Sequence, residues 1–170
     1  MIQREFVLPA EHSFPVDDWC LIESVFQPDK VAQMETLFAL SNGYLGMRGT
    51  FDEGEPNFLN GTYINAFYES WDIVYGEDAY GFAKMGQTML NVTEGKNIRL
   101  YVDDEPFYLP TANLLRFERK LNMKTGTLVR DLVWEMPSGK QVAIRSTRLV
   151  SFTHRHLAAI SYEVTVLNDH

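Results

Sequence analysis

The chain has 170 residues, of which 45% are hydrophobic and 13% aromatic, and it carries a formal net charge of −8. This length and composition predict one globular core and exclude a disordered chain. The acidic balance argues against a nucleic-acid surface and against an anionic membrane surface, because both need a basic stripe. We therefore expect no nucleic-acid partner and no membrane partner.

Cys20 is the single cysteine, which excludes a disulfide framework and a thiolate metal cluster. The N-terminus lacks the basic and then apolar layout of a signal peptide. No apolar run reaches the length of a membrane span. These features predict a soluble, cytoplasmic protein.

Helical periodicity is scarce and is clearest near the N-terminus, over residues 28–40. Pro28 and Asp29 open this segment, and its apolar residues follow at helical spacing: Val31, Met34, Leu37 and Phe38. Asn42 and Gly43 come after it, and both tolerate the left-handed conformation that ends many helices. We expect one short helix that stops at these two residues.

The segment ALSNGYLGMRGTFDEG, residues 39–54, has three glycines at a spacing of three, namely Gly43, Gly46 and Gly49. Glycine is used where the backbone needs a positive φ or where a neighbour approaches closely. The spacing fits neither a phosphate-binding loop, GxxxxGK, nor a dinucleotide-binding loop, GxGxxG, and no βαβ pattern surrounds it. Two interpretations remain. The one that we favour is a structural crossing, in which the glycines let a strand pass close to a neighbouring segment. The other is a loop that contacts a ligand or another domain.

Arg48 lies within this segment, and Asp52 and Glu53 follow it. A buried arginine needs a partner, because an unpaired charge inside a protein costs several kcal/mol. The two acids are the nearest candidates in sequence. We therefore expect Arg48 to lie beside one of them, or to point towards another domain.

The second half of the chain alternates apolar and polar residues, as strands do, with turn signals about every ten residues. Asp103 and Asp104 form one such turn, and further turns are expected at residues 124–126 and 137–139. The segments expected to be extended are residues 98–102, 106–109, 117–123, 128–136, 141–152 and 158–166. Antiparallel sandwiches and barrels have this pattern, so we predict an all-β fold. No closing element follows the last strand, and an unpaired last strand would expose an edge, so we expect residues 1–170 to be a piece of something longer.

Three further patterns admit a chemical interpretation. His154 and His156 lie on one face of an extended segment, but two imidazoles are too few for a metal site. A glycosidase-type carboxylate pair would depend on the fold, and the acidic residues available for it are Asp17, Asp18, Asp52, Glu53, Glu55, Asp103, Asp104 and Glu105. Aromatic residues between Tyr63 and Phe82 suit sugar stacking, and core or interface packing explains them equally well. The residues alone identify no self-contained active site.

Four segments of the chain carry a resemblance to a known family. The first is ETLFALSNGYLGMRGTFDEG, and the others are GTYINAFYE, LNMKTGTLVRDLVWEMPSGKQVAIRSTRLVSF and HLAAISYEVTVLND. In this order they resemble glycoside hydrolase family 65, the α-glucoside phosphorylases that act on maltose, kojibiose, nigerose or trehalose, and the first segment is similar to the N-terminal signature of that family. The resemblance covers most of the chain, from Trp19 to its end.

The resemblance implies that residues 1–170 form the N-terminal part of an antiparallel super-β-sandwich, which is incomplete here. It places the catalytic (α/α)6 barrel outside this chain. It also implies a parent enzyme that carries out inverting phosphorolysis of an α-linked disaccharide and releases β-glucose 1-phosphate. Inorganic phosphate is then a co-substrate, and no cofactor is expected. The general acid and the phosphate site of the family belong to the barrel, so this chain alone should be inactive.

The residues that match the signature receive only a structural or domain-contact role from the resemblance: Asn42, Gly43, Gly46, Arg48, Gly49 and Glu53. The expected partners are the catalytic barrel of the parent and its α-linked disaccharide, and the family implies a homodimer of the parent. Two alternatives remain open. One is a trehalose hydrolase of the same family, and the other is a stand-alone carbohydrate-binding or interaction module.

Overall fold

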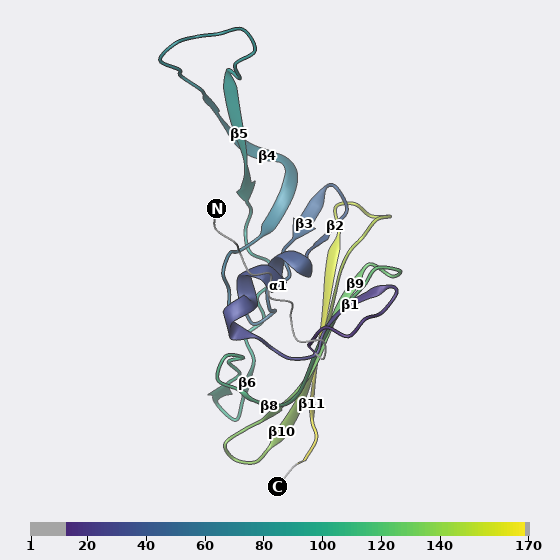
Figure 1. The fold of residues 1–170 in the computed structure, drawn as a ribbon. Coiled ribbons are helices and arrows are strands. Elements are labelled where there is room, and N and C mark those ends of the chain that lie inside the picture. The colour runs from purple at the N-terminus through teal and green to yellow at the C-terminus, as the bar shows by residue number, and fades with distance from the viewer. Residues whose placement is uncertain (1–12, 169–170) are drawn as a thin grey trace, which may run out of the picture.

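A five-stranded antiparallel sheet, in the order β1-β8-β9-β10-β11, forms the body of the molecule (Figure 1). The computed structural model describes residues 13–168. The strands of this sheet are β1 (Cys20–Glu23), β8 (Asn113–Asn122), β9 (Thr127–Glu135), β10 (Gln141–Val150) and β11 (Ala158–Val166). Gly126 and Gly139 adopt positive φ in the turns between the central strands, as the turn signals predict. The predicted all-β fold is confirmed.

Alternate side chains of β9 and β10 are buried on one face of this sheet, which we call the inner face. Two apolar clusters cover its two ends. The first contains Phe51, Phe107, Leu109, Phe117, Leu132, Trp134, Met136, Val142 and Ile144. The second contains Met34, Phe38, Leu40, Leu128 and Val150. The strip of sheet between the clusters carries charged side chains, which form the site described below.

One short helical segment lies near the N-terminus, as predicted, and consists of η2 (Pro28–Lys30) and α1 (Val31–Leu37). It packs on the inner face through Met34 and Phe38. The helix ends earlier than predicted: the N–H of Phe38 still donates to the carbonyl of Met34 (3.0 Å), but the N–H of Ala39 donates to the carbonyl of Thr36 (3.3 Å), which tightens the end before β2 begins at Leu40. The expectation that Asn42 and Gly43 stop the helix is therefore wrong.

Asn42 and Gly43 instead form the turn of a hairpin between β2 (Leu40–Ser41) and β3 (Leu45–Met47). The side-chain oxygen of Asn42 accepts hydrogen bonds from the backbone N–H groups of Tyr44 (2.9 Å) and Leu45 (2.8 Å). Gly43 has a φ of 83°, a conformation that favours glycine. The left-handed conformation expected of these two residues is present at Gly43, but it serves a hairpin and not the end of a helix.

β4 (Thr62–Asp72) and β5 (Met85–Asn91) form a long hairpin that extends away from the body of the molecule (Figure 1). With β2 and β3 they make a sheet in the order β2-β3-β4-β5. Neither strand is predicted from the sequence, because aromatic residues occur on both faces and hide the alternation. The large apolar side chains exposed on this hairpin are Phe67, Tyr68, Trp71, Val74, Tyr75, Tyr80, Phe82, Met85 and Met89. Packing in the core of this domain therefore does not explain most of these aromatic residues.

A third, small sheet consists of β6 (Tyr101–Val102) and β7 (Glu105–Pro106). Asp103 and Asp104 form the turn between them with φ of 49° and 63°, which confirms the predicted turn. The extended strand expected over residues 98–102 is reduced to its last two residues. Between residues 13 and 168, no helix has the length and apolar character needed to cross a membrane.

Close approach of the backbone explains only one of the three glycines in the segment 39–54. A Cβ atom at Gly49 would lie 2.6 Å from the Cβ of Phe38 and 2.7 Å from its carbonyl oxygen. A Cβ at Gly46 would meet only the Cβ of Ser41, at 3.7 Å, and one at Gly43 would meet nothing within 4 Å. Gly49 is thus the residue that lets the chain pass against the end of α1.

We expect Gly49→Ala to lower the free energy of unfolding by about 1–3 kcal/mol, because the added methyl group overpacks the contact with Phe38. Gly46→Ala is the matched control and should leave the free energy of unfolding within about 1 kcal/mol of the wild type. Urea unfolding followed by circular dichroism measures both. Equal losses in the two variants would contradict this assignment.

Candidate functional site

Three arginines lie on the inner face of the sheet, one on each central strand: Arg119 on β8, Arg130 on β9 and Arg148 on β10. We call them the arginine cluster. Arg119 and Arg130 are directly paired across the strands, and Arg130 is paired with Ser146, two residues before Arg148. All three arginines are at most 3% exposed. Because apolar clusters flank them, their charges must be balanced inside the protein.

Arg119 links β1, the sheet and the glycine segment. Its Nε donates to Oε2 of Glu23 on β1 (2.9 Å), and its Nη1 donates to the carbonyl of Gly49 (2.8 Å). The guanidinium lies over the rings of Phe38 and Phe51, at 4.3 and 4.6 Å from their centroids. This environment combines a charge pair with cation–π contacts that are strongest where water is excluded.

Arg148 holds the backbone of the crossing segment. It donates to the carbonyl of Arg48 (3.2 Å) and to the carbonyl of Thr50 (3.1 Å). It also donates to Oδ1 of Asp52. Acceptors of three alternate residues, 48, 50 and 52, are therefore fixed by one side chain, which explains how a segment without regular structure stays in place on the sheet.

Arg130 forms a two-pronged pair with Glu53, in which its Nη1 and Nη2 donate to the two carboxylate oxygens (2.6 and 2.5 Å). This is the geometry in which arginine binds a carboxylate most strongly. The hydroxyl of Tyr162 on β11 also donates to Oε1 of Glu53 (2.6 Å). Glu53 is thus a buried acceptor whose side chain is 4% exposed.

The pKa values of these carboxyl groups follow from burial and from the number of arginines near them. Burial raises the pKa of Asp52, but the charges of Arg148 and Arg130 outweigh burial and hold that pKa below its usual value. Burial raises the pKa of Glu23 above its usual value, because Arg119 offsets burial only in part. Asp52 is therefore ionised, and a general acid is not available from it near neutral pH.

Arg48, which was expected to pair with Asp52 or Glu53, pairs with neither. Its Nη2 lies 3.4 Å from Oε2 of Glu35 on α1 and donates to the carbonyl of Ala32 (3.1 Å). The prediction is wrong because Asp52 and Glu53 pair instead with Arg148 and Arg130, which are distant in sequence. The sequence does contain a sign of these buried arginines. Each lies at a position in β8, β9 or β10 where the alternation predicts an inward-facing, apolar residue.

The other signature residues also make contacts inside this domain. Asn42 donates through Nδ2 to the carbonyls of Ser151 (2.6 Å) and Arg155 (3.0 Å), which ties the β2–β3 hairpin to the loop after β10. The carbonyl of Gly43 accepts from Nδ2 of Asn65 (3.1 Å). In the same loop after β10, the ring of His156 packs edge-on against Tyr44, with 4.3 Å between the ring centroids. A contact of these residues with another domain stays a prediction.

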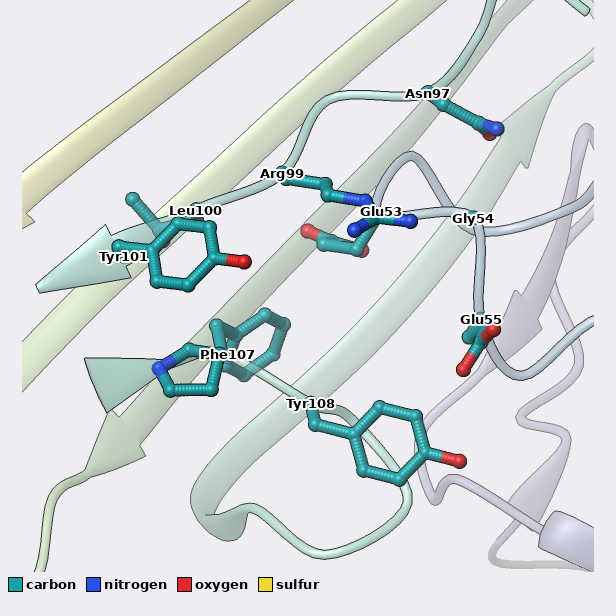
Figure 2. A pocket seen from close by; sticks show the side chains of 10 residues that line it. Glu53, Gly54, Glu55, Asn97, Arg99, Leu100, Tyr101, Phe107 and Tyr108 are labelled. Carbon is teal, nitrogen blue, oxygen red and sulfur yellow. The ribbon is translucent and has the colours of Figure 1, made fainter. Parts of the chain in front are cut away.

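A pocket of about 330 Å³ opens beside Glu53, between residues 53–55 and residues 97–108 (Figure 2). The backbone N–H of Ile98 donates to the carbonyl of Asp52 (2.6 Å), which joins its two walls. Gly54, with a φ of 85°, leaves space for Asn97, whose Oδ1 would lie 3.0 Å from a Cβ at that position. No residue of this pocket except Glu53 is predicted as a signature residue.

The buried carboxylate beside the pocket is held by fixed donors. Glu53 accepts two hydrogen bonds from Arg130 and one from the hydroxyl of Tyr162. Burial and the charge of Glu53 also raise the pKa of Tyr162, which keeps that hydroxyl protonated as a donor. The site therefore offers fixed polar atoms beside aromatic side chains.

Loss of Arg130 should destabilise the domain strongly. We expect Arg130→Ala to lower the free energy of unfolding by about 3–5 kcal/mol, because it leaves Glu53 buried without its main partner. Arg145→Ala is the control, since Arg145 lies exposed on the same sheet and pairs with Asp131 at the surface (3.2 Å). That variant should lose less than about 1 kcal/mol. Guanidinium unfolding measures both, and similar losses would refute a structural role for the cluster.

The lowered pKa of Asp52 predicts a dependence of stability on pH. The folded state holds this carboxyl group ionised, so its contribution is complete above the ordinary pKa of 3.8 and is lost as the pH falls through the lower, folded value. We expect the difference in free energy of unfolding between wild type and Asp52→Asn to be largest near neutral pH and to shrink below about pH 4. Urea unfolding at several pH values tests this. A difference that stays constant down to about pH 2 would contradict it.

Comparison with known proteins identifies the family. The model of the N-terminal domain of glycosyl hydrolase family 65 matches residues 21–170. The alpha,alpha-trehalose phosphorylase of Thermoanaerobacter brockii is 50% identical over 159 residues, which cover 91% of this chain and 20% of that protein. An uncharacterized glycosyl hydrolase of Mycobacterium tuberculosis is 48% identical over 160 residues, with coverage of 94% and 20%.

A solved structure agrees with these matches. The chain described as "Putative kojibiose phosphorylase from human microbiome" superposes with a TM-score of 0.75 at 29% identity, over 89% of this chain and 20% of that one. The present chain thus spans about a fifth of the length of the proteins that it matches. The resemblance inferred from the four sequence segments is confirmed, and the chain belongs to glycoside hydrolase family 65, in which it corresponds to the N-terminal domain.

Proposed function

We propose that this chain is the non-catalytic sandwich domain of a parent enzyme that carries out inverting phosphorolysis of an α-glucosyl disaccharide. The parent transfers the glucosyl group to inorganic phosphate and releases β-glucose 1-phosphate and a free sugar. The observation that carries this proposal is the 50% identity to an alpha,alpha-trehalose phosphorylase over 91% of the chain. Trehalose is accordingly the first substrate to test, and kojibiose and maltose follow from the names of other relatives.

The proposed non-catalytic role rests on the ion pairs and the burial of three acidic side chains. Asp52 and Glu53 are paired with arginines, and Glu23 is 0% exposed and out of reach of a substrate. Phosphorolysis needs a carboxylic acid that can protonate the leaving sugar and an anion site for phosphate. None of these three buried pairs supplies such a group, which supports a catalytic centre in another part of the parent.

The uncovered edge of the sheet supports contact with that other part. Val164 and Val166 on β11 are paired with Ile144 and Val142, so they belong to the inner face. Ile144 and Val142 are buried, whereas Val164 and Val166 are 41% and 46% exposed. The apolar inner face therefore continues beyond the segments that cover it, and the rest of the parent is the partner that we propose for it.

We expect the full-length parent to form glucose 1-phosphate from trehalose, kojibiose or maltose only when inorganic phosphate is present. The 170-residue chain alone should form none. A coupled assay for glucose 1-phosphate, run with and without phosphate, measures both. Release of glucose in the absence of phosphate would identify a hydrolase instead, and turnover by the 170-residue chain would refute the non-catalytic role.

A further inference from the structure

We propose that the pocket between residues 53–55 and 97–108 binds a neutral saccharide, with one sugar ring held against Tyr101 and Tyr108. The proposal concerns residues of this chain alone. Only the choice of α-linked disaccharides as probes rests on the proposed function. The chemistry that points to a sugar comes from the walls of the pocket, from its charge and from its rigidity.

Aromatic side chains line the pocket. Tyr101 is 58% exposed and Tyr108 is 42% exposed, although both belong to a segment that is otherwise fixed by the small β6–β7 sheet. Figure 2 shows the rings of Tyr101 and Tyr108 on either side of Phe107, all three from the same stretch of chain. Exposed tyrosine combines a flat apolar face with a hydroxyl group, which suits a ligand that is apolar on one side and polar at its edges. A sugar ring has such C–H faces and hydroxyl edges.

The polar groups supply both kinds of hydrogen-bonding partner. Asn97, Arg99 and Glu55 lie around the opening, and Figure 2 shows Arg99 beside Glu53. The amide of asparagine donates and accepts, the guanidinium donates, and the carboxylate accepts. Sugar hydroxyl groups act as donors and as acceptors, so a pocket that offers both kinds fits them better than one that offers a single kind.

The charge of the pocket favours a neutral ligand. The charge of Glu53 is balanced by its two-pronged pair with Arg130, beneath the pocket. The remaining formal charges of the lining, those of Glu55 and Arg99, are opposite in sign and cancel. The pocket therefore has no net charge with which to attract an ion of either sign, which leaves a neutral ligand as the better match.

The pocket is held in shape before any ligand binds. The N–H of Ile98 donates to the carbonyl of Asp52 (2.6 Å), and the N–H of Phe107 donates to the carbonyl of Leu100 (3.0 Å). A site that is already ordered loses little conformational entropy on binding. Its volume, about 330 Å³, is at the lower end of the range of small-molecule sites, which favours a mono- or disaccharide over a long chain.

Titration of the 170-residue chain with trehalose, kojibiose, maltose and glucose tests the proposal. We expect saturable binding by calorimetry, with dissociation constants on the order of millimolar, as for small solvent-open sites. Amide shifts in NMR spectra should concentrate in residues 53–55 and 97–108. Inorganic phosphate, titrated in the same way, should cause no saturable shift there.

Variants of Tyr108 separate binding from folding. Tyr108→Ala should weaken binding at least about tenfold, the effect of losing about 1.4 kcal/mol. Tyr108→Phe keeps the ring and should retain the affinity within about twofold. Tyr80→Ala, which removes an exposed tyrosine of the β4–β5 hairpin, is the control and should leave binding unchanged. The dispersion of the amide chemical shifts in the NMR spectrum of each variant shows whether that variant is folded.

The absence of saturable binding for all four sugars, or an unchanged affinity in folded Tyr108→Ala, would overturn the proposal. Saturable binding of phosphate at these residues would overturn it as well. The titrations contain no catalytic barrel and, in the sugar series, no phosphate. A parent that fails to phosphorolyse disaccharides would therefore contradict the proposed function without changing the outcome here.

Discussion

Three arginines buried on the inner face of one sheet bind the segment 48–53, and the pocket beside Glu53 depends on that contact. Arg148 and Arg119 hold backbone carbonyls, and Arg130 holds a carboxylate. Such pairs are costly to bury, so they add specificity of arrangement more surely than stability. They favour one register between the segment and the sheet, because each guanidinium has its own acceptors on the segment.

The pocket depends on this register. Glu53 is fixed from below by Arg130, and the chain then turns at Gly54 towards the outer surface. Residues 97–108 join the same turn through the contact between Ile98 and Asp52. The aromatic side chains at the surface are therefore positioned by charges that lie beneath them, although none of those charges contacts a ligand in our proposal.

Local patterns predicted much of the fold. The alternation in β9 and β10 and the glycine turns between them involve residues close in sequence, and both appear as expected. The β4–β5 hairpin was missed, because its exposed aromatic residues occur on both faces and erase the alternation that normally reveals a strand.

The candidate site was predicted less well, for a physical reason. The signature residues were found in the sequence, but the partner of Arg48 was assigned to the nearest acids, when the true partner is Glu35. The spacing along the chain can show which residues face inward, but the partner of a buried charge depends on which segments pack together. The pocket was missed for the same reason, since Tyr108 and Glu53 meet only after the segments between them have folded.

The sequence distance spanned by the arginine contacts also determines the order in which the chain can fold. Glu23 and its partner Arg119 are 96 residues apart in sequence, and Glu53 and Arg130 are 77 residues apart. Tyr162, which also binds Glu53, is 109 residues away from it. Contacts between residues so far apart slow folding, because the chain loses the entropy of closing a long loop before the contact forms and stabilises it. During synthesis on the ribosome, the crossing segment must therefore stay in water, with its carboxylates hydrated, until β9 and β11 have emerged.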